Sequence, residues 1–327
     1  MAIKINWKDL QKRIINGKEV EKVMYNGVQI RPSSTPPTPT FDDYLYFQIQ
    51  PQGTCHLSLI KQGNPTNVSL EISYDKQNWM DYTIDSDIEI THLTNIYFRN
   101  KSEVPTWFSN GRDDCYHFEF YPEDGSSADL YCGGDVTSLL CKNWTTTLTS
   151  DYCFANLFYG MPIITTPKLP ATTLTNWCYM NMFYGCTLLT TAPQLPATTL
   201  NDGCYFGMFG SCGTLTTPPQ LSATNLADQC YDSMFQYCTA LSVLPSLPAI
   251  NLGYASYESM FAGCFNIKLS DTQIWDYQTP YRIPTSGTSS ASGNSSAYHM
   301  FYNTWWTFRY PWTPNINQTY YTSNTVI

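Results

Sequence analysis

Residues 169–209 read LPATTLTNWCYMNMFYGCTLLTTAPQLPATTLNDGCYFGMF, and they contain one and a half copies of a repeating unit. Each copy is anchored by a small residue, usually cysteine, that is followed by an aromatic residue. Successive anchors lie 25, 26, 26 and 26 residues apart, at Cys153, Cys178, Cys204, Cys230 and Ser256. A fixed period of this length is the signature of a repeat architecture, in which neighbouring copies stack to bury a common core.

Several other columns keep the same register. A Leu-Phe or Met-Phe pair follows four residues after each anchor, and a leucine or isoleucine comes later, at Ile164 in the first copy and Ile267 in the fifth. A second cysteine column ends the motif, with Met161 in the first copy. We take the central members of these columns as the repeat core: Met182, Phe183, Leu189, Met208, Phe209, Leu215, Met234, Phe235 and Leu241.

The spacing within the motif C-Y-x-x-M-F-x-x-C fits a helix. At 100° per residue, its five apolar positions fall within one wedge of roughly 140°. The following stretch contains Pro193 and Pro196, which exclude helix and favour an extended path. The pattern therefore predicts copies that each contain one helix and one extended segment, stacked into a solenoid.

The first 31 residues form a separate module. Asn16-Gly17 and Asn26-Gly27 are flanked by β-prone runs, and Asn-Gly is the strongest short signal for a β-hairpin. Seven basic and three acidic residues give this module a charge of +4, whereas the remainder carries −13. Thirty residues bury little apolar surface alone, so we expect the module to attach to a partner. The candidate attachment residues are Lys12, Arg13, Ile15, Val20, Val23, Tyr25, Val28 and Ile30.

A linker and a β-rich region follow. Residues 32–40, PSSTPPTPT, are typical of an extended polyproline II spacer. Residues 41–140 contain short alternating runs separated by turn residues, at a spacing that predicts a small β-sandwich. Examples of the expected strands are residues 44–49, 70–74, 88–90, 96–98 and 117–120.

Composition excludes several classes of protein. Only 13% of the 327 residues are charged and 15% are aromatic, which rules out disorder over most of the chain. A net charge of −9 argues against nucleic-acid binding, and no apolar run is long enough for a membrane span. The start of the sequence has no secretory signal pattern. We therefore expect synthesis in a cytosol, although the polar, weakly charged composition is typical of an external surface.

No catalytic or metal-binding set can be identified. The two cysteines within a copy lie eight residues apart, which does not match the Cys-x₂₋₄-Cys spacing of zinc sites. Small buried thiols are the favoured interpretation of the repeat cysteines. The state of Cys55, Cys115, Cys132 and Cys141 stays open. The four histidines match no triad or metal motif, and we expect no cofactor.

Three segments resemble known families. The stretch quoted at the outset resembles the 26-residue leucine-rich repeats of the surface-antigen type, found in gut bacteria and their phages. Residues 70–82, LEISYDKQNWMDY, are similar to the small β-domain that often precedes such repeats. Residues 12–32, KRIINGKEVEKVMYNGVQIRP, resemble the N-terminal module of structural proteins in tailed phages, including crAss-like phages. In this order, they resemble a virion fibre or decoration protein.

The fold class expected from the residues and the resemblance is mixed α+β. It comprises a β-meander attachment module (1–31), a Pro-rich linker (32–40), a β-sandwich (41–140), a leucine-rich-repeat solenoid (141–270) and an aromatic C-terminal cap (271–327). The implied function is a non-enzymatic head fibre or similar surface fibre of a tailed bacteriophage. The implied partners are capsid or tail proteins, a host-surface glycan or protein, and further copies in a homotrimer, without nucleic acid or membrane insertion. A bacterial adhesin with leucine-rich repeats and a glycan-degrading tailspike are the alternatives.

Overall fold

A computed structural model describes residues 23–25, 28–30 and 44–267 except 124, 126 and 250, together with residues 296, 299, 300 and 302. The chain forms two compact units, Met1–Pro39 and Thr40–Ile327. In the first unit, β1 (Val23–Tyr25) and β2 (Val28–Ile30) pair antiparallel around Asn26-Gly27, where the sequence predicts a hairpin. The Asn16-Gly17 pair lies outside the described residues.

The second unit begins with two β-sheets. Its strands are β3 (Leu45–Pro51), β4 (Cys55–Gln62), β5 (Leu70–Ser73), β6 (Met80–Tyr82), β7 (Ile88–Ile90), β8 (Thr94–Asn100), β9 (Cys115–Pro122), β10 (Ala128–Gly133) and β11 (Ile163–Thr165). Six strands form one sheet in the order β11-β10-β3-β8-β5-β6, and three form the other in the order β7-β4-β9. All these pairs are antiparallel except β10 with β11.

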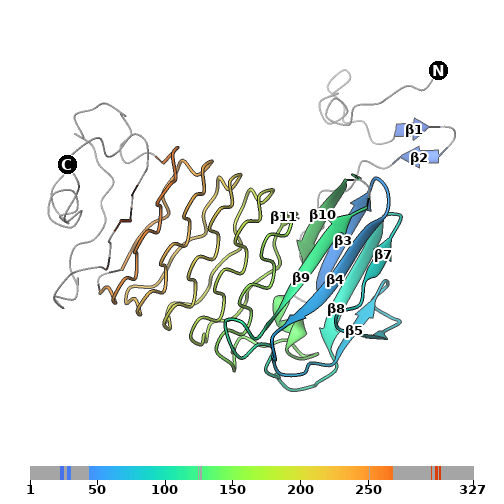
Figure 1. The fold of residues 1–327 in the computed structure, drawn as a ribbon, viewed down its shortest axis with the longest axis horizontal. Coiled ribbons are helices and arrows are strands. Elements are labelled where there is room, and N and C mark those ends of the chain that lie inside the picture. The colour runs from blue at the N-terminus through green and yellow to red at the C-terminus, as the bar shows by residue number, and fades with distance from the viewer. Residues whose placement is uncertain are drawn as a thin grey trace. The chain divides into compact units, whose positions relative to one another are not determined.

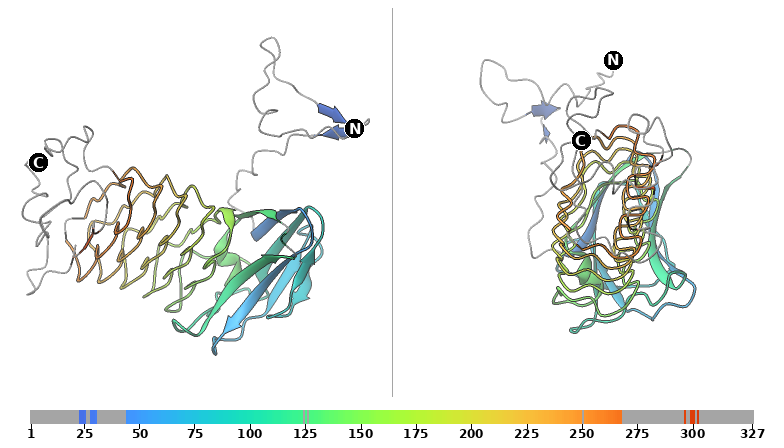
Figure 2. Two further views of the ribbon diagram at one scale, coloured as in Figure 1. Left: turned by 45° about the horizontal axis from the view of Figure 1, so that its top comes forward. Right: turned by 90° about the vertical axis from the view of Figure 1, so that its left-hand side faces the viewer.

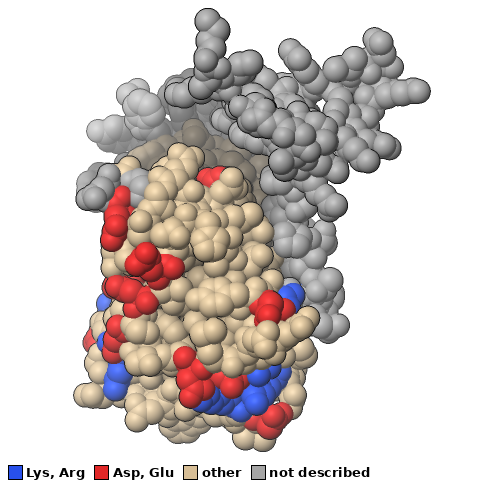
Figure 3. All heavy atoms as spheres, turned by 90° about the vertical axis from the view of Figure 1, so that its right-hand side faces the viewer, with Lys and Arg blue, Asp and Glu red and all other residues tan. Residues whose placement is uncertain are grey.

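The two sheets pack face to face because each strand buries alternate residues. In β4, Leu57 and Leu59 are completely buried. Phe47 of β3 and Phe98 of β8 contact Phe118 of the opposite sheet, with ring centroids 4.8 and 5.2 Å apart. Figure 3 shows the end of this region, where most of the surface is uncharged and the basic groups lie beside acidic ones.

The repeats form a stack of coils that follows the sheets (Figures 1 and 2). Seen end-on in the right-hand view of Figure 2, the successive coils superpose. We define the turn segment of a copy as the residues from two before its anchor to eight after it. Alternate N–H groups of a turn segment donate to the next copy, as from Tyr179 to Cys204 O (3.0 Å) and from Phe183 to Met208 O (2.9 Å). The intervening N–H groups close turns within the copy, as from Met182 to Tyr179 O (3.2 Å).

The expected helix in each copy is wrong, and with it the mixed α+β class. The only helix among the described residues is a short 3₁₀ turn, η1 (Val136–Leu139), and the described chain is largely β. Every fourth residue of a turn segment has a positive φ, for example Asn181 (51°) and Gly185 (74°) in the second copy. A positive φ is incompatible with an α-helix but suits the third position of a type II turn. No helix of the described residues is long and apolar enough to cross a membrane.

Stacked side chains fill the interior of the coils. One ladder of parallel rings runs from Phe158 through Phe183, Phe209 and Phe235 to Phe261, with centroids 5.4–5.7 Å apart. A second runs from Phe154 along the tyrosine column to Tyr257. The first ladder continues into the sheets, because Phe118 of β9 stacks on Phe158 at 5.6 Å. The sheets and the repeats therefore share one continuous core.

Two details of the repeat alignment differ from expectation. In the first copy Ile163, not Ile164, occupies the buried leucine column, because this copy is one residue shorter than the others between its Met161 and Leu169. A sixth copy also stacks on the fifth. The N–H groups of Tyr257 and Phe261 donate to the carbonyls of Ser296 and Met300, at 2.7 and 2.8 Å. The step from Ser256 to Ser296 is 40 residues, which is 14 more than the regular period of 26.

Candidate functional site

The nine residues taken as the repeat core are all completely buried. They fix the geometry of the coils, whereas side chains at the outward positions of the turn segments contact solvent. These outward positions are the candidate functional surface, which we call the turn face.

The second cysteine column binds neighbouring copies together. The thiols of Cys186, Cys212, Cys238 and Cys264 donate to the carbonyls of Phe158, Phe183, Phe209 and Phe235 in the preceding copies, at 3.0–3.1 Å. In the first copy, Met161 occupies this position in place of a cysteine. Cysteine suits the other positions because its side chain is small and apolar yet carries a weak S–H donor.

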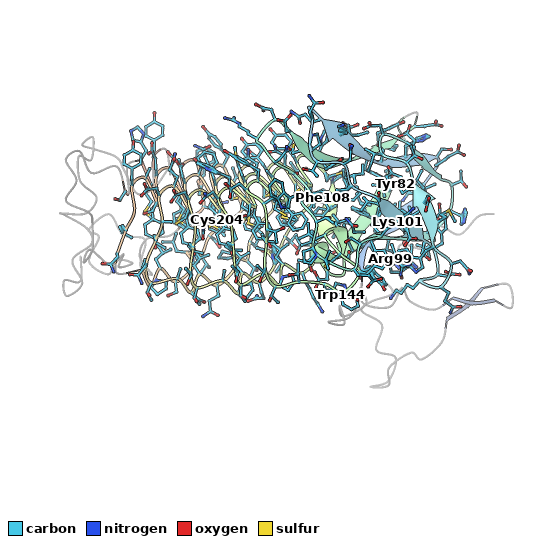
Figure 4. The ribbon with its side chains drawn as sticks, turned by 90° about the horizontal axis from the view of Figure 1, so that it is seen from below. Tyr82, Arg99, Lys101, Phe108, Trp144 and Cys204 are labelled. Carbon is cyan, nitrogen blue, oxygen red and sulfur yellow. The ribbon has the colours of Figure 1, made fainter. Side chains whose placement is uncertain are left out.

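All twelve cysteines are unpaired and buried, as Figure 4 shows for Cys204 inside the stack. Desolvation raises the pKa of the Cys212 and Cys264 thiols to about 12. Burial likewise raises the pKa of Cys178 to about 12 and that of Cys204 well above its usual value. These thiols therefore stay protonated and unreactive at neutral pH.

Acidic and amide side chains line one edge of the turn face, two residues before each of the first four anchors. Asp151 accepts a hydrogen bond from the N–H of Asn176 (3.0 Å), Asp202 from that of Asp228 (3.2 Å), and Asp228 from that of Tyr254 (2.7 Å). Each carboxylate thus satisfies a backbone donor of the next copy. These acids have a structural role, and they also make this edge negatively charged.

Two further acids lie in the fourth and fifth copies, at Asp232 and Glu258. Burial raises the pKa of Asp232 to about 6, although Ser233 Oγ donates to its carboxylate at 2.7 Å. Burial also raises the pKa of Glu258, and the nearby His299 of the sixth copy opposes this shift. Among residues 151–267 the charged groups are Lys168 and five acids: Asp151, Asp202, Asp228, Asp232 and Glu258. All five acids belong to turn segments, so the rest of the coil surface carries little charge.

Rows of hydroxyl and amide groups occupy another side of the coils. The exposed pairs Thr172-Thr173, Thr198-Thr199 and Thr224-Asn225 occur at the same position of successive copies. Asn225 and Asn251 are bridged by a side-chain hydrogen bond, and their backbones pair in parallel. This side of the stack is polar without being charged.

The predicted attachment residues are only partly described. Val23 and Tyr25 lie in β1, and Val28 and Ile30 lie in β2, where Val23 is paired with Ile30. Lys12, Arg13, Ile15 and Val20 lie outside the described residues. The aromatic segment predicted as a cap, 271–327, also lies outside them apart from Ser296, His299, Met300 and Tyr302.

The two-sheet region pairs its charged groups locally. His56 Nε2 lies 2.9 Å from Glu123, and His117 Nε2 lies 3.1 Å from Glu119. Arg99 pairs with Glu71 at 2.8 Å and covers the ring of Trp79 at 3.8 Å. Figure 4 shows Arg99 and Lys101 in this region, away from Cys204. Within the described part of the chain, no three His, Cys, Asp or Glu residues are grouped to hold a metal ion.

No protein-family model matches the chain, and neither a curated protein nor a solved structure is significantly similar to it.

The turn geometry leaves a signal in the sequence that the helical interpretation overlooks. Glycine directly precedes the second column residue in the first, second and fifth copies, at Gly160, Gly185 and Gly263. Asparagine stands four residues before the first two of these glycines, at Asn156 and Asn181, and the third copy has Gly203 and Gly207 four residues apart. Glycine and asparagine recurring at a four-residue spacing disfavour a helix but tolerate positive φ.

Proposed function

We propose that this chain is a structural appendage of a tailed-bacteriophage virion, a head fibre or a similar surface fibre. In this proposal residues 1–31 attach to a capsid or tail protein, and the leucine-rich-repeat solenoid binds a host-surface or gut glycan or protein. Residues 41–140 serve as the β-sandwich between them. The chain has no catalytic step of its own to perform.

The observation that carries the proposal is the state of the cysteines. Twelve buried, unpaired thiols suit a protein that folds in a reducing cytosol, since disulfides form where proteins are exported into oxidising compartments. The coil surface nevertheless presents hydroxyl, amide and aromatic groups with few charges, as proteins exposed outside cells do. A virion protein reconciles the two, because it folds in the host cytoplasm and reaches the exterior when the cell lyses. An exported bacterial adhesin would meet the oxidising compartment first.

Charge and avidity support the attachment role of the N-terminal module. Its charge of +4 would be attracted to an acidic docking surface that repels the remaining residues, which carry −13. A homotrimer would repeat the same weak contacts and bind with avidity.

A deletion tests this assignment. Particles that lack the protein are mixed with the full chain or with a chain that lacks residues 1–40, and the bound protein is measured after sedimentation. We expect the full chain to decorate the particles and the truncated chain to remain in solution. Equal occupancy by both chains would place attachment elsewhere. Binding of the full chain to bacterial envelopes but not to particles would favour the adhesin.

A further inference from the structure

The outer face of the three-stranded sheet gathers acidic side chains around one exposed ring. Because the residues of a strand alternate between the two faces of a sheet, the outward positions of β4 and β9 form two aligned rows. These rows are His56, Ser58 and Ile60 in β4 and, opposite them, Tyr121, Glu119 and His117 in β9. Glu89 of β7 is exposed and is aligned with His56 from the other side. Lys61 is the only lysine or arginine in these three strands, and it belongs to the alternate row of β4.

The side chain of Tyr121 lies across this sheet. Its ring stacks on the ring of His56, with centroids 4.8 Å apart and planes inclined by 15°. Its hydroxyl donates to Asp87 Oδ2 at 2.9 Å, and Asp87 directly precedes β7. The tyrosine side chain therefore begins on β9, passes over β4 and ends beside β7. One face of the ring covers His56, yet Tyr121 is 42% exposed, so the opposite face contacts solvent.

Two histidines orient the glutamates that flank this ring. His56 Nε2 lies 2.9 Å from Glu123 Oε1, and His117 Nε2 lies 3.1 Å from Glu119 Oε1. The histidine side chains are only 12% and 21% exposed, whereas the glutamate side chains are 51% and 52% exposed. The packed imidazoles thus direct the carboxylates without covering them. Groups that are already held in place lose less side-chain freedom when they bind a ligand.

Three polar atoms under this cluster have no hydrogen-bond partner among the described residues, although they are buried: Ser58 Oγ, His56 Nδ1 and His117 Nδ1. Ser58 is 1% exposed and lies in its row beside His56, opposite Glu119. Such unsatisfied groups cost stability, which a binding site can explain. When Nε2 donates to a glutamate, a neutral imidazole presents Nδ1 as an acceptor, and a hydroxyl oxygen accepts as well. The cluster is therefore rich in acceptors. We call Asp87, Glu89, Glu119, Tyr121 and Glu123 the acidic aromatic face.

We propose that the acidic aromatic face binds a lysine- or arginine-rich segment of a partner protein. An ammonium or guanidinium group can lie on the open ring face of Tyr121, while the carboxylates around it accept its hydrogen bonds. Four carboxylates spread across the sheet suit several basic residues of one segment. They repel nucleic acids and anionic lipid headgroups, so charge complementarity favours a basic protein segment. The inference is independent of the proposed function, because neither attachment through residues 1–31 nor host binding by the repeats requires it.

Fluorescence anisotropy with the full chain tests the proposal. The probe is a labelled nona-arginine peptide at about 0.15 M salt, where charges farther apart than roughly 8 Å are screened, and nona-glutamate is the comparison. We expect the wild type to bind nona-arginine and not nona-glutamate. Tyr121→Leu removes the ring and should weaken binding by about two- to fivefold, whereas Tyr121→Phe keeps the ring and should bind like the wild type. Glu119→Gln removes one charge and should weaken binding by a similar factor.

Asp129→Asn is the matched control for charge. Asp129 is an exposed acid of β10 in the other sheet, so this change removes the same charge away from the acidic aromatic face and should leave binding unchanged. Thermal unfolding identifies misfolded variants, and Glu119→Gln, which alters an exposed group, decides the outcome should Tyr121→Leu unfold. The assignment is wrong if the wild type does not bind nona-arginine, or if folded Tyr121→Leu and Glu119→Gln both bind like the wild type. Equal weakening by Asp129→Asn and Glu119→Gln would also overturn it, because binding would then follow net charge alone.

Discussion

Replacing Gly185 by alanine tests the backbone conformation of the repeats. The change in the free energy of unfolding has one sign for a turn and the opposite sign for a helix. Gly185 has a φ of 74°, and a Cβ atom built there would meet nothing closer than Gly160 Cα at 3.5 Å, an ordinary contact. The substitution therefore adds backbone strain without a collision. A left-handed conformation costs a residue with a Cβ about 1–2 kcal/mol. The lower entropy of the unfolded alanine chain offsets about 0.4–1 kcal/mol of this cost.

We therefore expect Gly185→Ala to lower the free energy of unfolding by up to about 1.6 kcal/mol, the difference between these two contributions. If residues 178–186 were helical, the same change would instead raise it by about 1 kcal/mol, because alanine is the better helix former. Urea unfolding followed by circular dichroism measures the difference. Gly213→Ala is the matched control, since Gly213 lacks a positive φ and its Cβ would lie 3.6 Å from Thr239 Oγ1. The control should be neutral or slightly stabilising. A stabilising Gly185→Ala would refute the turn geometry.

Three further changes probe the interior of the stack. Leu215→Ala removes a completely buried side chain from the leucine column and should cost about 2–5 kcal/mol in urea unfolding. Ser256→Cys should stabilise the protein by about 1–2 kcal/mol in the same assay, because the buried Ser256 hydroxyl has no hydrogen-bond partner among the described residues, and the four preceding members of its column are cysteines. Burial raises the pKa of Asp232 from 3.8 to about 6. Between these pH values the folded protein keeps a proton on Asp232 that the unfolded chain releases. The free energy of unfolding therefore falls as pH rises through this window. Asp232→Asn should flatten that slope in unfolding measured from pH 4 to pH 7, and an unchanged slope would exclude Asp232 as its source.

Much of the architecture could be predicted because turn residues, apolar alternation and the repeat period can be recognised in the sequence alone. The Asn26-Gly27 pair predicts the β1–β2 hairpin, since few other sequences tolerate two successive positive φ values. Alternating apolar residues predict strands at residues 44–49 and 96–98, where the structure has β3 and β8. The repeat period predicts the phenylalanine and leucine ladders, because identical copies must present the same side chain at the same height.

The predicted helix is wrong because a helix and a series of four-residue turns place apolar residues at the same spacing. Apolar residues at i, i+4 and i+8 lie on one face of a helix, but they also line up when the chain turns every four residues. Gly185 before Cys186 was the discriminating signal, since glycine in the penultimate position of a short helix disfavours it. The one-residue shift to Ile163 could not be foreseen, because the shorter first copy leaves two adjacent isoleucines as candidates.

The candidate site was less predictable than the fold. The turn face depends on which side chain of one copy lies over which residue of the next, a relation across 26 residues. Trp177 above Gly203 and Tyr184 above Gly210 are recognisable only after the register of the copies is known. The thiol hydrogen bonds of Cys212 and Cys238 likewise follow from the stacking distance rather than from the local sequence.

The location of the protein on virus particles is the most direct test of the whole account. Virions purified from a culture that produces the protein are imaged by electron microscopy with a gold-labelled antibody against residues 141–270. The account predicts gold on projections of the capsid or tail, and none on particles that lack the protein. Gold confined to bacterial envelopes, with unlabelled virions in the same field, would contradict it.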